Sequence, residues 1–206
     1  MENKNWHSEN SCRIRGRILK KEPIDASKTF LLVETTLPGG KKTEVPCSVS
    51  RQYMPGGKNA LRIGAWAELT GVLDGIAVEE PEFAMWWVEV TEVRVLPADG
   101  KKTYQNHAFL RGVMEESGCL LDKGVPVSAD FFLEMRGTNK NLFGMEAVVP
   151  RRAVHQFLGA LGTREVAVEG ALEFFLAEKS GKDCVGTLLH VRSIAGVKGE
   201  TKKNDS

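Results

Sequence analysis

Apolar and polar residues alternate along most of this chain, which is the pattern of β-strands with one buried face. In segment 12–21, for example, Cys12, Ile14 and Ile18 fall on one face and Arg15 falls on the other. Nine further segments are alternating or β-branched and are separated by turn residues or polar loops. The ten predicted strands are 12–21, 30–36, 42–50, 66–73, 86–96, 108–116, 127–136, 142–149, 165–175 and 184–194.

The fifth predicted strand contains a slip in this alternation. Val88 and Val90 share one face, whereas Val93 falls on the other. One extra residue in the strand would reconcile the two parts, so we predict a β-bulge near Thr91-Glu92.

A single short helix is predicted between the eighth and ninth strands. Pro150 is suited to a helix start, and Gly162 is suited to its end. Its predicted apolar face follows the spacing i, i+3, i+4 and i+7: Val154, Phe157, Leu158 and Leu161.

The two halves of the chain resemble each other at offsets of 96 to 100 residues. The matched segments are Arg15-Gly16 with Arg111-Gly112, Val49-Ser50-Arg51 with Val149-Pro150-Arg151, Leu69-Thr70-Gly71 with Val168-Glu169-Gly170, and Val93-Arg94-Val95 with Val191-Arg192-Ser193. Four matches in order at a near-constant offset predict an internal repeat of one domain type. The expected boundaries are a first domain at 10–97, a linker at 98–106, a second domain at 107–197 and a disordered tail at 198–206.

The order of strands, with a helix or long loop between the third and fourth, resembles the oligonucleotide-binding (OB) fold. A glycine inside the first strand and an apolar-Xaa-Gly-Xaa-Leu pattern in the fourth (Leu69 to Leu73, Val168 to Leu172) add to the resemblance. The implied fold is all-β with a short helix, built as two tandem OB-type five-stranded barrels. Among OB proteins the chain looks most like the bacterial and phage single-stranded-DNA-binding group.

Composition narrows the function classes. The chain has 206 residues and a net charge of +1, so any nucleic-acid site must come from local charge rather than from a basic chain. No apolar run is long enough to span a bilayer, and residues 1–7 lack the apolar core of a secretory signal, so we expect a cytoplasmic protein without membrane contact. Cys12, Cys47, Cys119 and Cys184 form no CxxC pair, which favours buried free thiols over a metal site.

No sequence motif for catalysis or for a cofactor is present. The four histidines are isolated, and no phosphate-binding loop or nucleophile motif occurs. We therefore expect neither an enzyme nor a cofactor or metal.

Single-strand binders of this fold combine cationic groups with aromatic side chains that stack on bases. In the first predicted barrel, alternating arginines line one strand, lysines and further arginines lie on nearby strands and loops, and aromatic residues accompany them. The candidate nucleic-acid-binding residues there are Arg13, Arg15, Arg17, Lys28, Lys42, Arg51, Tyr53, Lys58, Arg62, Trp66 and Trp87.

Two alternatives remain open for these residues. The arginines could form an ordinary solvated face, and the tryptophans could belong to the core. Trp86 and Trp87 are adjacent and must point to opposite faces of a strand, and we place Trp87 outside because it shares a face with Glu89.

The second predicted barrel is less suited to binding phosphates. Glu165, Glu169 and Glu173 recur on the outer face of one strand and would repel them. Its candidate contributors are Phe132, Arg136, Arg151 and Arg152.

The favoured function is non-catalytic binding of single-stranded nucleic acid, DNA rather than RNA, through a basic and aromatic groove of the first barrel. The alternative is a protein-interaction or assembly module without nucleic-acid contact. The expected partners are single-stranded DNA or RNA, further copies of the chain as a homo-oligomer, or replication and repair proteins.

Overall fold

The computed structural model describes residues 10–56, 61–78, 83–100, 102–136, 142–179 and 182–197. The first half forms β1 (Asn10–Pro23), β2 (Lys28–Thr36), β3 (Lys42–Ser50), a 3₁₀ turn (Arg51–Tyr53), β4 (Trp66–Val78) and β5 (Phe83–Val95). The second half forms β6 (Gln105–Asp122), β7 (Val125–Arg136), β8 (Leu142–Pro150), a 3₁₀ turn (Arg151–Ala153), α1 (Val154–Ala160), β9 (Glu165–Lys179) and β10 (Lys182–Gly196). All ten predicted strands are confirmed, and most are longer than predicted. The predicted turn 137–141, the tail 198–206 and Lys58 lie outside the described residues.

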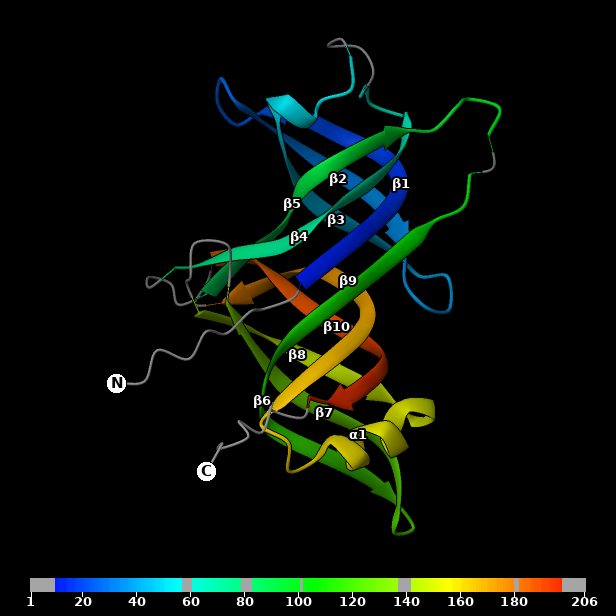
Figure 1. The fold of residues 1–206 in the computed structure, drawn as a ribbon, viewed down its shortest axis with the longest axis vertical. Coiled ribbons are helices and arrows are strands. Elements are labelled where there is room, and N and C mark those ends of the chain that lie inside the picture. Colours follow the sequence, from blue (N-terminus) through cyan, green and yellow to red (C-terminus); the bar gives the residue numbers. More distant parts are fainter. Residues whose placement is uncertain are drawn as a thin grey trace, which may run out of the picture.

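The strands close into two barrels. They pair in the order β2-β3-β5-β4-β1-β6-β7-β8-β10-β9, and β1 also pairs with β2 and β6 with β9. The β1–β2 pairing closes strands β1 to β5 into the first barrel, and the β6–β9 pairing closes strands β6 to β10 into the second. In each barrel the third and fifth strands are parallel. This arrangement confirms the predicted tandem OB plan, and Figure 1 shows the two barrels stacked along the long axis of the molecule.

The two barrels share one hydrogen-bonded junction. β1 pairs with β6 in antiparallel register, from Asn10 opposite Leu110 to Arg15 opposite Gln105. At the end of this pairing the Thr35 hydroxyl lies 3.1 Å from the carbonyl oxygen of Arg15 and 3.0 Å from that of Gln105. The ten strands therefore form one continuous sheet.

The helix closes the far end of the second barrel by a narrower contact than predicted. Phe157 stacks on Phe131 with ring centroids 6.0 Å apart, and Ala160 is also buried. Leu158 and Leu161, which were predicted to face the core, are 40% and 44% exposed. That part of the prediction is wrong because a helix of seven residues has only about two turns. Its buried stripe at i, i+3 and i+6, which consists of Val154, Phe157 and Ala160, is enough to cover the barrel end.

The predicted bulge in β5 is present. Thr70 of β4 lies opposite Glu92, whereas its neighbour Gly71 lies opposite Val90, so Thr91 is the extra residue. The bulge bends β5 where it must serve the curvature of a small barrel.

The second barrel has the same bulge, and it corrects one of the four repeat matches. Gly170 lies opposite Val191, and the next pair skips Arg192. Gly170 corresponds to Gly71, so Val191 corresponds to Val90 rather than to Val93. The match of residues 93–95 with 191–193 is therefore wrong by three residues, because a Val-Arg pair recurs there by coincidence.

Glycines in the first strands allow close backbone approach. A Cβ atom on Gly16 would collide with the carbonyl oxygen of Glu34, and one on Gly112 would collide with that of Glu134. Bare backbone at these positions lets β1 and β6 bend from one side of their barrel to the other.

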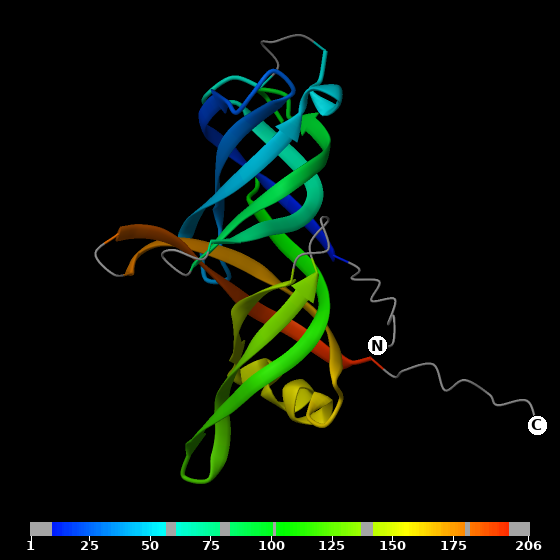
Figure 2. The ribbon, with the colours of Figure 1, turned by 90° about the vertical axis from the view of Figure 1, so that its left-hand side faces the viewer.

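Each barrel also sends its fourth–fifth strand hairpin against the other barrel. The indole of Trp86 in β5 meets the ring of Phe143 in β8 edge-on, with centroids 4.7 Å apart. In return, the Thr43 hydroxyl in β3 accepts a hydrogen bond from the Phe174 amide in β9 at 3.2 Å. Figure 2 shows the β9–β10 hairpin projecting to one side at the level where the barrels meet.

A buried carboxylate strengthens this contact. Glu173 in β9 forms an ion pair with Lys41 of the first barrel and lies 2.6 Å from His190 Nε2 in β10. Burial opposes ionisation of Glu173, but Lys41 and His190 outweigh burial and lower the pKa of the carboxyl group.

Two of the cysteines behave as predicted and one does not. Cys12 and Cys47 are buried free thiols, and burial raises the pKa of Cys12 to about 12. Cys119 is exposed, which contradicts its predicted burial, because β6 runs past the barrel there into the β6–β7 hairpin. The side chain of Cys184 lies outside the described residues.

The described residues contain neither a membrane-spanning helix nor a metal-binding cluster. No described helix has the length and apolar character needed to cross a membrane. No cluster of three or more His, Cys, Asp or Glu side chains among the described residues could hold a metal ion.

The close approach at Gly16 predicts a strong effect of a small change. We expect Gly16→Ala to lower the free energy of unfolding by about 1–3 kcal/mol or more, because the new methyl group meets backbone that cannot move freely. Gly159 in α1 is the matched control, since its Cβ would enter open space. Gly159→Ala should raise stability by about 0.4–1 kcal/mol. Urea unfolding measures both, and equal effects would contradict this explanation.

The lowered pKa of Glu173 predicts a pH dependence of stability. A carboxyl group with a lowered folded-state pKa stabilises the fold fully above its unfolded pKa, and this contribution is lost as the pH falls through the folded value. We expect Glu173→Gln to cost on the order of 1 kcal/mol at pH 7 and to flatten the loss of stability on acidification. Denaturation from pH 7 to pH 3 tests this, with the exposed Glu169→Gln as control. A parallel decline in wild type and Glu173→Gln would disprove it.

Candidate nucleic-acid interface

The outer face of β2, β3 and β5 carries an apolar groove with a volume of about 650 Å³. The inward positions of these strands fill the core, so their outward positions are left to form this surface. The groove is lined by Ile24, Lys28, Phe30, Leu32, Glu44, Pro46, Ser48, Met85, Trp86, Trp87, Phe174, Phe175, Leu176 and Val185. We call it the β2–β3 groove.

Strand register brings aromatic and apolar side chains together in its floor. Phe30 in β2 lies opposite Ser48 in β3, and Leu32 lies opposite Pro46. β3 continues in parallel register to β5, with Cys47 opposite Val88, which places Pro46 near Trp87. Phe30 and Trp87 therefore lie on the same face, on either side of β3.

A single carboxylate holds both a cation and an indole in this groove. Glu89 Oε1 lies 2.9 Å from Lys28 Nζ. Glu89 Oε2 accepts a hydrogen bond from Trp87 Nε1 at 3.2 Å. Trp87 is half-buried while Trp86 is buried, which confirms the predicted sidedness of the pair.

The second barrel supplies one wall of the groove. Phe175 and Leu176 in β9 are 44% and 81% exposed and line the groove from the side of the β9–β10 hairpin. The ring of Phe175 covers Gly186 of β10, where an added Cβ would collide with it. The Thr43–Phe174 and Lys41–Glu173 contacts fix this wall against the first barrel.

The three arginines of β1 lie elsewhere, on the sheet formed by β4, β1 and β6. Arg13 is exposed beside Thr70 and His107 and forms no ion pair with any described residue. Arg15 Nε donates to Glu68 Oε2 at 2.7 Å. The arginines do not share the groove of Trp87, which lies farther along the barrel, opposite Asp74 of β4.

Arg17, Lys42 and Trp66 gather instead around Glu34. Tyr104, from the segment before β6, donates its hydroxyl to Glu34 Oε1 at 2.6 Å, and Lys42 Nζ lies 3.1 Å from Oε2. Arg17 lies 3.6 Å from the same carboxylate, and the ring of Trp66 packs against Tyr104 at 4.7 Å. The Tyr104 hydrogen bond and the Lys42 ammonium lower the pKa of Glu34, so these cations serve an anionic partner within the fold.

The remaining candidates of the first barrel lie at its ends. Arg51 and Tyr53 are exposed in the 3₁₀ turn after β3, and the Arg51 amide donates to Ser27 at 2.7 Å, next to Lys28 at the end of the groove. Arg62 is exposed in the segment before β4.

The corresponding face of the second barrel is acidic. Phe132 in β7 is 37% exposed and covers Gly144 of β8, but Asp130, Glu134 and Glu146 share its face. Arg151 and Arg152 are exposed in the 3₁₀ turn that directly follows β8 and precedes α1.

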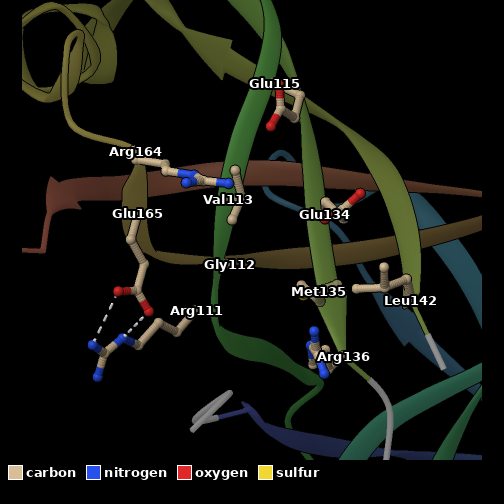
Figure 3. Close-up of a pocket in the computed structure, with 10 residues that line it drawn as sticks. All are labelled: Arg111, Gly112, Val113, Glu115, Glu134, Met135, Arg136, Leu142, Arg164 and Glu165. Atoms are coloured by element: carbon tan, nitrogen blue, oxygen red, sulfur yellow. Dashed lines mark hydrogen bonds and ion pairs between the residues drawn. The ribbon is translucent and has the colours of Figure 1, made fainter. Parts of the chain in front are cut away.

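Arg136 lines a separate small hollow of about 170 Å³ at one side of the second barrel. Figure 3 shows Arg111, Arg136 and Arg164 around it, together with Glu115, Glu134 and Glu165. Arg111 binds Glu165 through two hydrogen bonds, Nε to Oε1 at 2.7 Å and Nη2 to Oε2 at 3.3 Å. We call this feature the Arg111 hollow.

Sequence reasoning did not identify Phe30, Glu89 or Phe175 as part of the groove, although it used Glu89 to place Trp87 on the outer face. Both faces of 28–36 are partly apolar, so alternation alone does not say whether Phe30 points outward. The adjacent pair Phe174-Phe175 carried the same signal as Trp86-Trp87, since one member of such a pair must face away from its barrel.

Comparison with known proteins gives the fold. No family model matches the sequence, and no curated protein shows significant sequence similarity to it. The structure is similar to that of the single-stranded DNA binding protein from Thermus aquaticus, with a TM-score of 0.65 and 12% identity over 93% of this chain and 94% of that chain. A deletion mutant of that protein gives a TM-score of 0.66 and 14% identity over 96% and 98% of the two chains. The tandem-barrel fold predicted from the sequence is therefore shared with a solved single-stranded DNA binding protein over nearly the whole chain.

Proposed function

We propose that this protein binds single-stranded nucleic acid, DNA in preference to RNA, in the β2–β3 groove of its first barrel and catalyses no reaction on it. The observation that carries the proposal is the groove itself. OB folds bind oligonucleotides on the face of their second and third strands, and that face here presents Phe30, with Trp87 beside it on β5.

The chemistry of the groove suits bases more than phosphates. Stacking of a base on an aromatic side chain is worth about 1–3 kcal/mol and does not depend on sequence. Phe30, Trp87 and Phe175 offer three such surfaces. Lys28 and the exposed Arg51 provide the nearby cations that a phosphate backbone requires.

The second barrel is not proposed as an equal binding surface. Asp130, Glu134 and Glu146 on its corresponding face would repel phosphates. Its proposed part in binding is the wall formed by Phe175 and Leu176. The similarity to a protein described as binding single-stranded DNA supports DNA as the ligand.

A protein-interaction module is the second candidate, because Leu176 and Met85 leave much apolar surface uncovered at the groove. Salt separates the two functions. Binding of nucleic acid weakens linearly in a plot of log K against log salt, whereas an apolar protein contact does not. Titration of tryptophan fluorescence with oligothymidine and oligouridine at several salt concentrations, together with light scattering of the free protein, tests both.

Trp87→Ala should weaken oligothymidine binding by about 1–3 kcal/mol, which is roughly 5- to 150-fold in Kd, because a stacking surface is lost. Trp66→Ala is the matched control, since Trp66 is also half-buried but packs on Tyr104 away from the groove. Its Kd should remain near that of wild type. Equal losses in both variants would place the binding site elsewhere.

Glu89→Gln should strengthen binding. The substitution removes the charge that neutralises Lys28 but keeps an oxygen to accept the Trp87 hydrogen bond. We expect a lower Kd. We also expect a steeper slope of log K against log salt, by up to about the release of one more counterion. Glu68→Gln, which frees Arg15 on the β1 face, is the control and should leave the slope unchanged. A response to Glu68→Gln alone would move the interface to β1.

A further inference from the structure

The floor of the β2–β3 groove contains a buried hydroxyl without a hydrogen-bond partner. Ser48 is 5% exposed and lines the groove, and its Oγ atom has no partner among the described residues. Thr187 is the other such hydroxyl in the described part of the chain, and it does not line the groove. An unpaired buried hydroxyl destabilises a fold, and alanine would avoid this cost. Such a group calls for an explanation, and a ligand that completes its hydrogen bond is one.

Ser48 lies on β3, the middle strand of the groove floor, between two aromatic side chains. It is opposite Phe30 in the ladder with β2 and opposite Glu89 in the ladder with β5. The hydrogen bond from Trp87 Nε1 to Glu89 Oε2 ties the indole to this side of Ser48. Strands two apart in a sheet are separated by about 9.5 Å, and stacked bases by about 3.4 Å. Rings that rise from β2 and β5 can therefore hold one base between them, with its edge directed at β3.

The polar neighbours of Ser48 are already occupied. Glu89 Oε1 lies 2.9 Å from Lys28 Nζ and 3.5 Å from Ser50 Oγ. Glu89 Oε2 accepts the hydrogen bond of the Trp87 indole. Phe30, the neighbour on β2, offers only a hydrocarbon side chain. The described residues thus leave the Ser48 hydroxyl to a bound molecule.

We propose that the Ser48 hydroxyl forms a hydrogen bond with the edge of a base that is held between Phe30 and Trp87. This inference rests on the proposed function, since the base belongs to the single strand bound in the groove. A hydroxyl donates to a carbonyl oxygen or ring nitrogen and accepts from an N–H, so it suits any base. The apolar surroundings strengthen the bond because they lower the local dielectric constant.

The hydroxyl is covered in the free protein, so the base reaches it only when side chains of the groove change rotamer. Such changes are common at interfaces on binding. Stacking on Phe30 and Trp87 then contributes affinity without regard to the base edge, whereas Ser48 contributes only when that edge can form a hydrogen bond. The two contributions can therefore be measured separately.

A base analogue separates the hydrogen bond from stacking. Difluorotoluene keeps the shape and the methyl group of thymine but lacks its carbonyl oxygens and its N–H. The Kd of the full chain is measured for a short oligothymidine and for the same oligomer with difluorotoluene at every position. Ser48→Ala should weaken oligothymidine binding by about 2- to 12-fold, the range for one neutral hydrogen bond, and should leave the Kd for the analogue nearly unchanged.

Ser50→Ala is the matched control. Ser50 lies two residues along the same face of β3, but its hydroxyl has Glu89 as a partner and it does not line the groove. This variant should change the two Kd values by the same factor, because it removes no contact to a base.

Stability provides a second measurement that a purely structural role would not satisfy. Ser48→Ala should raise the urea midpoint of unfolding while it weakens binding, because it removes an unpaired buried hydroxyl. A lower midpoint would show that the hydroxyl supports the fold and would overturn the proposal.

Two binding results also count against it. Unchanged oligothymidine binding by Ser48→Ala would exclude the contact, and equal weakening for both oligomers would assign the hydroxyl to the sugar or the phosphate. Failure of the wild type to bind either oligomer would instead reject the proposed function itself, and this inference with it.

Discussion

The antiparallel pairing of β1 with β6 is the constraint on which the rest of the structure depends. It joins two closed barrels through backbone hydrogen bonds rather than through a flexible linker, from Asn10 opposite Leu110 to Arg15 opposite Gln105. Because the register of a sheet is discrete, this pairing fixes both the distance and the rotation between the barrels. The contacts of Trp86 with Phe143 and of Thr43 with Phe174 follow from that fixed geometry.

The two copies share a backbone plan but differ in the surfaces they present. On the second–third strand face, the first barrel has Phe30, with Trp87 on the adjoining β5, and the second has Asp130 and Glu146. Beside the first-strand glycine, Tyr104 fills the first barrel, whereas the described residues of the second barrel line a hollow of about 170 Å³. Both differences lie outside the two cores, so they leave the shared backbone plan unchanged.

Much of the fold could be read from the sequence because it depends on local patterns. Alternation located the strands, a single slip in it located the bulge at Thr91, and the glycines Gly16 and Gly112 marked the bends. The helix face was misjudged at Leu158 and Leu161 because the length of the docked helix is set by the barrel end rather than by the helix sequence.

The candidate site was harder to predict because it depends on which strands pair and in which register. Arg15 is an exposed cation in the alternation pattern, and only the register of β1 with β4 reveals Glu68 as its partner. Phe175 reaches the groove of the other barrel through tertiary contacts that local sequence does not encode. Alternation in 28–36 left the direction of Phe30 undecided, since Leu31 and Val33 fit the core equally well.

The packing of each barrel's hairpin against the other barrel has an evolutionary consequence. Each copy of the duplicated unit depends on its sister for part of its own surface, so that neither copy could be deleted, shuffled or inherited alone without loss to the other. Selection then acts on the pair as a single unit. One copy is free to specialise in ligand contact while the other drifts toward a supporting role, provided that the interlocking residues are kept.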